Sequence, residues 1–114
     1  MSYIKTLKDA RVIKTKGETI YEFDIGDFPH GIAIADIKES RLHHHLKTHE
    51  WYWLAEGSGE IVLDGKTRKI RKHDFIYIKP GTKHKVKSTD GILLIVISYP
   101  KWRAEDHIID EQEK

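Results

Sequence analysis

Residues 41–59, RLHHHLKTHEWYWLAEGSG, contain four of the eight histidines in this 114-residue chain, together with Glu50. Imidazole nitrogens and carboxylate oxygens are donors that divalent transition metals prefer. On an extended backbone, His43 and His45 share one face with their Cα atoms about 7 Å apart, whereas His44 points the other way. This stretch therefore predicts part of a metal site, although the same residues could form a solvated loop beside an aromatic strand.

A third and a fourth ligand must come from neighbouring segments. Glu50 enters the next strand after a short loop, which allows its carboxylate to converge on the two imidazoles. His84 follows the Pro80–Gly81 turn at the head of another predicted strand. His44 and His49 are expected to face outward or lie in the loop, and replacement of one of the other ligands by either of them is the alternative.

The strand after the histidines, EWYWL, alternates between two faces. Glu50, Tyr52 and Leu54 share the face that we expect to point inward. Tyr52 is there a candidate catalytic proton donor or substrate contact, with a simple core role as the alternative. Trp51 and Trp53 face outward and are too apolar to leave in water. They predict either a homodimer interface or contact with a second sheet of the same chain.

Alternating apolar residues and short turns predict an all-β chain of many short strands, typical of a sandwich or barrel. A tight Asp64–Gly65 turn predicts a hairpin, and Thr89–Asp90–Gly91 predicts a turn between two further strands. Only residues 102–114 have a helical pattern, which predicts a short C-terminal helix. The predicted strands lie at 11–16, 19–25, 31–38, 59–63, 66–70, 74–79, 84–87 and 92–100.

Composition excludes several functional classes. The chain has no cysteine, so any metal must be bound by His, Asp or Glu. A formal net charge of +2 argues against nucleic-acid binding, which needs a concentrated basic surface. The longest apolar run, Ile92–Ile97, is far shorter than a membrane helix, and the lysine-containing N-terminus lacks the apolar core of a signal peptide. We therefore expect a cytoplasmic protein without a membrane partner.

The spacing of the histidines resembles the first motif of the cupins, small β-barrels of jelly-roll type. That motif has the form G-x5-H-x-H-x3-4-E-x6-G. His43, His45, Glu50 and Gly57 reproduce every position after the leading glycine, which is replaced by Ile37.

The second cupin motif, G-x5-P-x-G-x2-H-x3-N, is matched in part. Gly81 and His84 agree with it, whereas His73, Lys79 and Ser88 replace its first glycine, its proline and its asparagine. These replacements concern turns rather than ligands. The two motifs lie within 38–88, and the resemblance implies one cupin domain over residues 1–114, a jelly-roll β-barrel with a short C-terminal helix.

The resemblance implies one divalent metal inside the barrel, bound by His43, His45, Glu50 and His84. It also implies a homodimer, the arrangement that cupins commonly adopt. Three neutral imidazoles and one carboxylate suit iron, manganese, nickel, cobalt, zinc or copper. Four protein ligands leave two positions of an octahedral ion open for a small oxygen-rich substrate, with or without dioxygen.

The expected function is that of a metal-dependent enzyme, either an oxygenase or an isomerase or epimerase. The alternative is a module that binds or senses a metal and a small sugar-like ligand without turnover.

Two further features have weaker functional interpretations. Lys79 could attract an anionic substrate, although a solvated strand face explains it better. Asp106 or His107 could act at the site, although His107 is more often an ordinary surface histidine and the C-terminal segment is expected mainly to pack on the barrel through Trp102.

Overall fold

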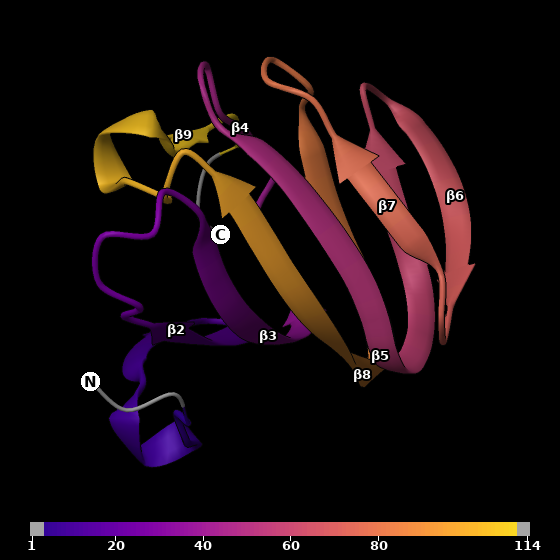
Figure 1. Ribbon diagram of the computed structural model, residues 1–114. Helices are drawn as coiled ribbons and strands as arrows, with labels where there is room; N and C mark the ends of the chain where they lie inside the picture. Colours follow the sequence, from indigo (N-terminus) through magenta and orange to yellow (C-terminus); the bar gives the residue numbers. More distant parts are fainter. Residues whose placement is uncertain (1–3, 112–114) are drawn as a thin grey trace.

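The computed structural model describes residues 4–111, which form a curled β-sheet with two short 3-10 helices (Figure 1). The predicted all-β architecture is confirmed. No helix within residues 4–111 is long and apolar enough to cross a membrane. The strands are β1 (Arg11–Thr15), β2 (Glu18–Phe23), β3 (Gly31–Glu39), β4 (His43–His44), β5 (His49–Leu63), β6 (Lys66–Arg71), β7 (Phe75–Ile78), β8 (His84–Tyr99) and β9 (Ile108–Ile109). The 3-10 helices are η1 (Leu7–Asp9) and η2 (Ala104–Asp106).

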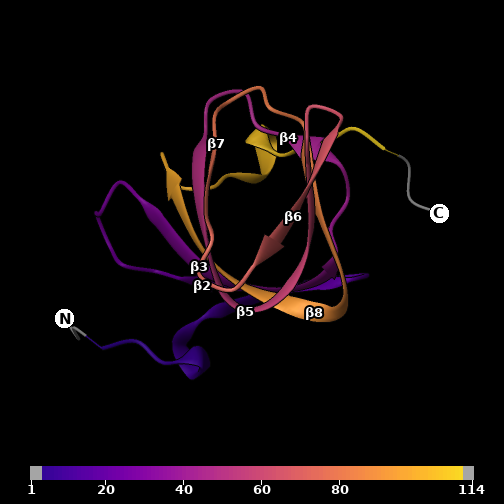
Figure 2. The ribbon, with the colours of Figure 1, turned by 90° about the vertical axis from the view of Figure 1, so that its right-hand side faces the viewer.

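The sheet is organised around the two longest strands, β5 and β8. All pairings are antiparallel, and the strand order is β1-β2-β3-β8-β4-β9. Strand β5 pairs with β8 along most of its length and also with β6 and β7. A view turned by 90° shows the sheet curling on itself, with the yellow C-terminal segment at one end (Figure 2).

A bulge bends β8 in its middle. Gly57 of β5 pairs with Ile92, and Glu60 pairs with Lys87, so two residues of β5 lie opposite four of β8. Extra residues in one strand of a pair bend that strand and increase its twist. The predicted turn ending at Gly91 is therefore wrong as a strand boundary. The residues do depart from regular pairing, with Gly91 at φ +95°, but β8 continues through them.

The curl brings distant parts of β8 together. Glu50 pairs with Ser98 near the end of β8. Its Oε1 atom nevertheless lies 3.2 Å from Nε2 of His84, the first residue of the same strand. The barrel curvature is thus what allows one carboxylate to meet a histidine from the opposite end of a neighbouring strand.

The C-terminal segment is not the helix that its sequence pattern predicts. After the three-residue turn η2, Ile108 and Ile109 form β9 and pair with His44 and His43 of β4. Asp110 continues this pairing by donating its N–H to the Leu42 carbonyl. Hydrogen bonds to a distant strand therefore override the local helical preference. Residues 112–114 of the predicted helix lie outside the described residues.

The curled sheet has an apolar inner face and a partly apolar outer face. As alternation predicts, Glu50, Tyr52 and Leu54 are buried, whereas Trp53 is 40% exposed. The buried core comprises Ala35, Ile37, Tyr52, Leu54, Ile61, Ile70, Ile78, Val86, Ile92 and Leu94.

The predicted Asp64–Gly65 hairpin joins β5 and β6, with both residues at positive φ (48° and 83°). It offers a matched comparison with Gly57, which also has positive φ (+90°) but lies in the bent region. A Cβ atom on Gly57 would come 2.5 Å from the carbonyl oxygen of Gly91, whereas one on Gly65 would meet nothing within 4 Å.

We expect Gly57→Ala to lower the free energy of unfolding by roughly 2–4 kcal/mol, because backbone strain adds to a clash with another strand. Gly65→Ala should cost only about 1–2 kcal/mol, since it bears the backbone strain alone. Urea unfolding followed by tryptophan fluorescence measures both values. Equal losses in the two variants would contradict the close approach of β5 and β8 at the bulge.

Candidate metal centre

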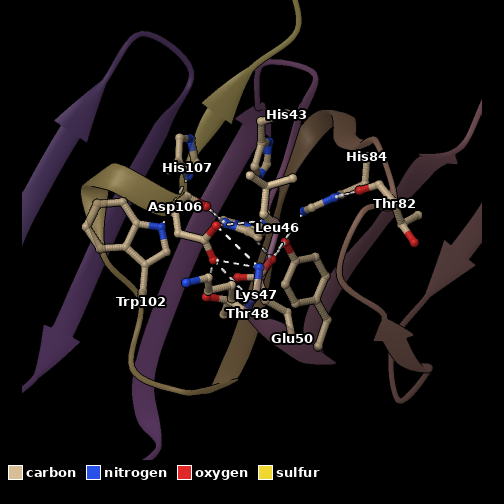
Figure 3. Close-up of polar contacts among 12 residues, drawn as sticks. His43, Leu46, Lys47, Thr48, Glu50, Thr82, His84, Trp102, Asp106 and His107 are labelled. Carbon is tan, nitrogen blue, oxygen red and sulfur yellow. Dashed lines mark hydrogen bonds and ion pairs between the residues drawn. The ribbon is translucent and has the colours of Figure 1, made fainter.

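The four predicted ligand residues come together inside the curled sheet. Each of His43, His45, Glu50 and His84 is buried, and each offers a ligand atom that lies within 4.8 Å of the other three. His43 comes from β4, His45 from the loop that follows, Glu50 from β5 and His84 from β8. Figure 3 shows His43, Glu50 and His84 on the same side of the sheet, with His84 coming from a strand distant in the sequence.

The three imidazoles are oriented in the same way. The Nδ1 atoms of His43, His45 and His84 lie 2.7, 2.6 and 2.8 Å from the backbone carbonyl oxygens of Arg41, Asp106 and Thr82, respectively. A carbonyl oxygen only accepts, so each Nδ1 must carry a proton and donate it. In the neutral ring, Nε2 then keeps a free lone pair, as in histidines whose second nitrogen binds a metal.

Glu50 lies where these lone pairs meet. Its Oε1 atom is 3.1 Å from Nε2 of His45 and 3.2 Å from Nε2 of His84. Despite this short distance, Nε2 of His45 is buried and forms no hydrogen bond within residues 4–111. A carboxylate facing two nitrogen lone pairs is repulsive unless a proton or a metal cation lies between them. The donor set and the unpartnered nitrogen therefore fit a group that could hold one metal ion.

Burial and mutual contact shift the pKa values in the cluster. Burial, with the neighbouring His84, lowers the pKa of His43 to about 3, so its ring is neutral at pH 7. Burial alone would raise the pKa of Glu50, but its interactions with His45 and His84 hold it below its usual value. Burial alone would lower the pKa of His45, and its interaction with Glu50 reverses that shift. An ionised Glu50 therefore faces at least one imidazole with a raised proton affinity.

Asp106 anchors the C-terminal segment beside the cluster. Its carboxylate accepts hydrogen bonds from the backbone N–H groups of Leu46, Lys47 and Thr48, and from the Thr48 hydroxyl. Burial would raise the pKa of this carboxyl, but these four donors lower it. The backbone carbonyl of the same residue holds Nδ1 of His45. One residue thus fixes both the loop after His45 and the orientation of the His45 ring.

Tyr52 is the predicted residue that lies beside the cluster without belonging to it. The side chain is 6% exposed, and the hydroxyl donates to Oε1 of Glu50 over 3.3 Å. Burial and the negative charge of Glu50 raise the pKa of Tyr52 well above its usual value. The phenol therefore remains protonated at neutral pH, where it can donate a hydrogen bond but cannot act as a base.

The other predicted candidates lie apart from the cluster. His44 turns away and pairs with Asp110, with 2.8 Å between Nδ1 and Oδ2. His49 contacts the Tyr77 hydroxyl on the outer face at 2.7 Å. Lys79 is exposed and does not line the cavity beside the cluster, so it is not positioned to attract a substrate there.

Two cavity residues were not identified as the main candidates from the sequence. His107, which the sequence favours as an ordinary surface histidine, stacks on His43 with ring centroids 4.4 Å apart. Glu18 of β2 lines the same cavity, where burial and the charge of Glu50 raise its pKa. Alternation along β2, with Glu18, Ile20 and Glu22 on one face, was the available signal for Glu18. No local pattern places His107 against β4.

The cavity has a volume of about 1030 Å³ and opens beside the cluster. Its wall includes His43, His45, Glu50 and Tyr52 together with apolar residues of the inner sheet face. Basic side chains such as Arg41 and Lys85 also contribute to the wall. The space is sufficient for a small molecule in contact with the cluster.

Among curated proteins, an uncharacterized protein of Methanocaldococcus jannaschii, MJ1618, is 37% identical over 67 residues. The matched region is 57% of this chain and 54% of that protein, so the chain matches about half the length of this relative.

Two solved structures are similar to the whole fold. Pac13 of Streptomyces, a nucleoside dehydratase that was also solved with uridine, has a TM-score of 0.87 at 14% identity, covering 100% of this chain and 95% of Pac13. Ectoine synthase from P. lautus has a TM-score of 0.77 at 16% identity, covering 99% of this chain and 93% of the synthase. At such identities the likeness establishes the shared fold alone.

The family model described as a cupin domain matches residues 34–98, which contain all four residues of the cluster. This match covers more than half of the chain and agrees with the curled sheet and its structural neighbours. The chain therefore belongs to the cupin family.

Proposed function

We propose that this cupin is a metal-dependent enzyme that acts on a small oxygen-rich molecule. In this proposal His43, His45, Glu50 and His84 bind one divalent first-row transition metal. The main support is the arrangement of three Nε2 atoms and a carboxylate around one point beside a cavity of about 1030 Å³. The proposal is also supported by enzymes that share this fold and act on small molecules, among them a nucleoside dehydratase.

A bound divalent metal would polarise a carbonyl or hydroxyl oxygen of the substrate and stabilise negative charge on it. The chain itself supplies groups for proton transfer. Tyr52 is a buried phenol that keeps its proton at neutral pH, and Glu18 is a carboxyl whose pKa is raised by burial and by the charge of Glu50. A donor and a potential acceptor on one cavity wall favour isomerase or epimerase chemistry over an oxygenase, which does not require them.

Metal content tests the ligand assignment. Protein purified without an affinity tag should contain about one equivalent of a divalent transition metal by mass spectrometry. In a structure of the loaded protein, the metal should lie about 2.0–2.2 Å from three nitrogens and one oxygen. His84→Ala should reduce metal retention at least tenfold, because one of four ligands is lost. His49→Ala is the control, since His49 lies on the outer face. Equal metal content in both variants would remove His84 from the site.

A second prediction concerns Asp106, which orients His45 without binding the metal in this proposal. We expect Asp106→Asn to weaken metal binding about 10- to 100-fold, because it weakens the hydrogen bonds from Leu46, Lys47 and Thr48 that hold the Asp106 carbonyl in place against His45. Asp110→Asn is the matched control, because Asp110 lies in the same segment but pairs with His44 outside the cluster. Competition with a chromogenic chelator measures both affinities. A similar loss of metal affinity in both variants would contradict a specific role of Asp106 and would indicate general loosening of the C-terminal segment.

The outer face of the sheet supports a further proposal, that two copies form a homodimer through Trp51 and Trp53. Cross-strand neighbours make a continuous apolar row in which Trp53 lies between Phe75 and Ile95. Phe75 is 61% exposed and Tyr77, the neighbour of Trp51, is 47% exposed. A second copy presents the same uncharged row, so it can cover this face by two-fold symmetry.

Sedimentation velocity tests the dimer. Trp53→Lys should shift the protein toward the monomer, since a buried interface would then contain two unpaired ammonium groups. Leu46→Lys is the matched control, because Leu46 is also an exposed apolar residue (63%) but lies in the loop between β4 and β5 and is not part of this row. An unchanged sedimentation coefficient for Trp53→Lys would contradict this interface.

A further inference from the structure

A fourth imidazole, that of His107, lies against the metal cluster but is oriented by a different partner. The indole Nε1 of Trp102 lies 3.2 Å from Nδ1 of His107. An indole N–H can only donate, so Nδ1 of His107 must accept with a free lone pair. The proton of this ring is then on Nε2, and the ring is neutral. The cluster imidazoles have the opposite arrangement, with Nδ1 donating to a carbonyl.

The position of His107 places this donor beside the cluster. Its ring stacks on His43 with centroids 4.4 Å apart and an interplanar angle of 21°, and its centroid is 5.3 Å from that of His45. Trp102 and His107 both line the cavity, and Figure 3 shows them on the flank of the cluster nearest the C-terminal segment. Within residues 4–111, Nε2 of His107 makes no hydrogen bond, and this atom is not fully buried. It is therefore accessible to a ligand.

We propose that His107 is a neutral hydrogen-bond donor to a ligand bound at the metal, with Trp102 as the residue that fixes its tautomer. This inference rests on the metal site proposed above. With its lone pair on Nδ1 engaged by the indole, His107 cannot be a fifth metal ligand. Its Nε2–H selects ligands that carry an acceptor oxygen next to the metal-binding atom, such as a small carboxylate, an α-hydroxy ketone or an enediolate. A second role is to stabilise negative charge that develops on that oxygen.

Nuclear magnetic resonance tests the tautomer directly. Two-bond ¹H–¹⁵N correlations of zinc-loaded and metal-free protein at pH 7 should show His107 with its proton on Nε2 and the three cluster rings with a proton on Nδ1. In Trp102→Phe, His107 should become a mixture of tautomers, because the indole donor is lost while an aromatic ring remains. An Nδ1-protonated His107 in the unmodified protein would overturn the proposal.

Ligand binding to cobalt(II)-loaded protein tests the consequence, with visible absorption as the readout. Acetate carries a second oxygen that can accept from His107, whereas 1-methylimidazole binds the metal without offering an acceptor. We expect His107→Phe to weaken acetate binding roughly tenfold, the typical effect of losing a hydrogen bond to a charged group, and to leave 1-methylimidazole binding unchanged. His107→Gln, which retains an N–H donor, should recover most of the acetate affinity.

The cobalt content of each sample separates the two proposals. If the unmodified protein takes up no cobalt, the proposed metal site fails and the role of His107 fails with it. If it takes up one equivalent but His107→Phe binds acetate normally, only the role of His107 is overturned. A parallel loss of acetate and 1-methylimidazole binding would also overturn that role, since it would indicate a damaged metal site rather than a missing donor.

Discussion

The arrangement of the barrel interior depends on one electrostatic constraint, the contact of a buried carboxylate with the Nε2 atoms of two histidines. Glu50 approaches His45 and His84 within 3.1 and 3.2 Å, and backbone carbonyls occupy the other nitrogen of each ring. Such a cluster is stable only with positive charge at its centre, from a proton or from a metal cation. The pKa shifts agree with this requirement, because the pKa of Glu50 is lowered, which keeps it ionised, and the pKa of His45 is raised.

The fold meets this constraint by bringing residues 43–50, the start of β8 and the C-terminal segment to one point. The bulge opposite Gly57 bends β8, so that His84 at the start of this strand reaches a glutamate paired near its end. On the other side, Asp106 fixes the loop after His45 through its carboxylate and the His45 ring through its carbonyl. The C-terminal segment is thus part of the site, and it brings His107 into the same cavity.

The sequence predicts these features unevenly, for physical reasons. Strand alternation correctly places Glu50 on the buried face, and the spacing of His43 and His45 anticipates their convergence, because both patterns are local. The C-terminal helix is predicted wrongly, since Asp106 makes its decisive hydrogen bonds about 60 residues away in the chain. The role of Gly91 is also missed, because a turn signal and a bulge within one strand use the same residue types.

The central claim is that the cluster binds a metal through three imidazoles and one carboxylate. X-ray absorption at the metal edge of the loaded protein tests it most directly, because imidazole rings give a distinctive multiple-scattering pattern. The account predicts three imidazole nitrogens and at least one oxygen at about 2.0–2.2 Å. A metal surrounded only by oxygen atoms, or one with fewer than two imidazoles, would contradict it and would place the bound ion elsewhere on the chain.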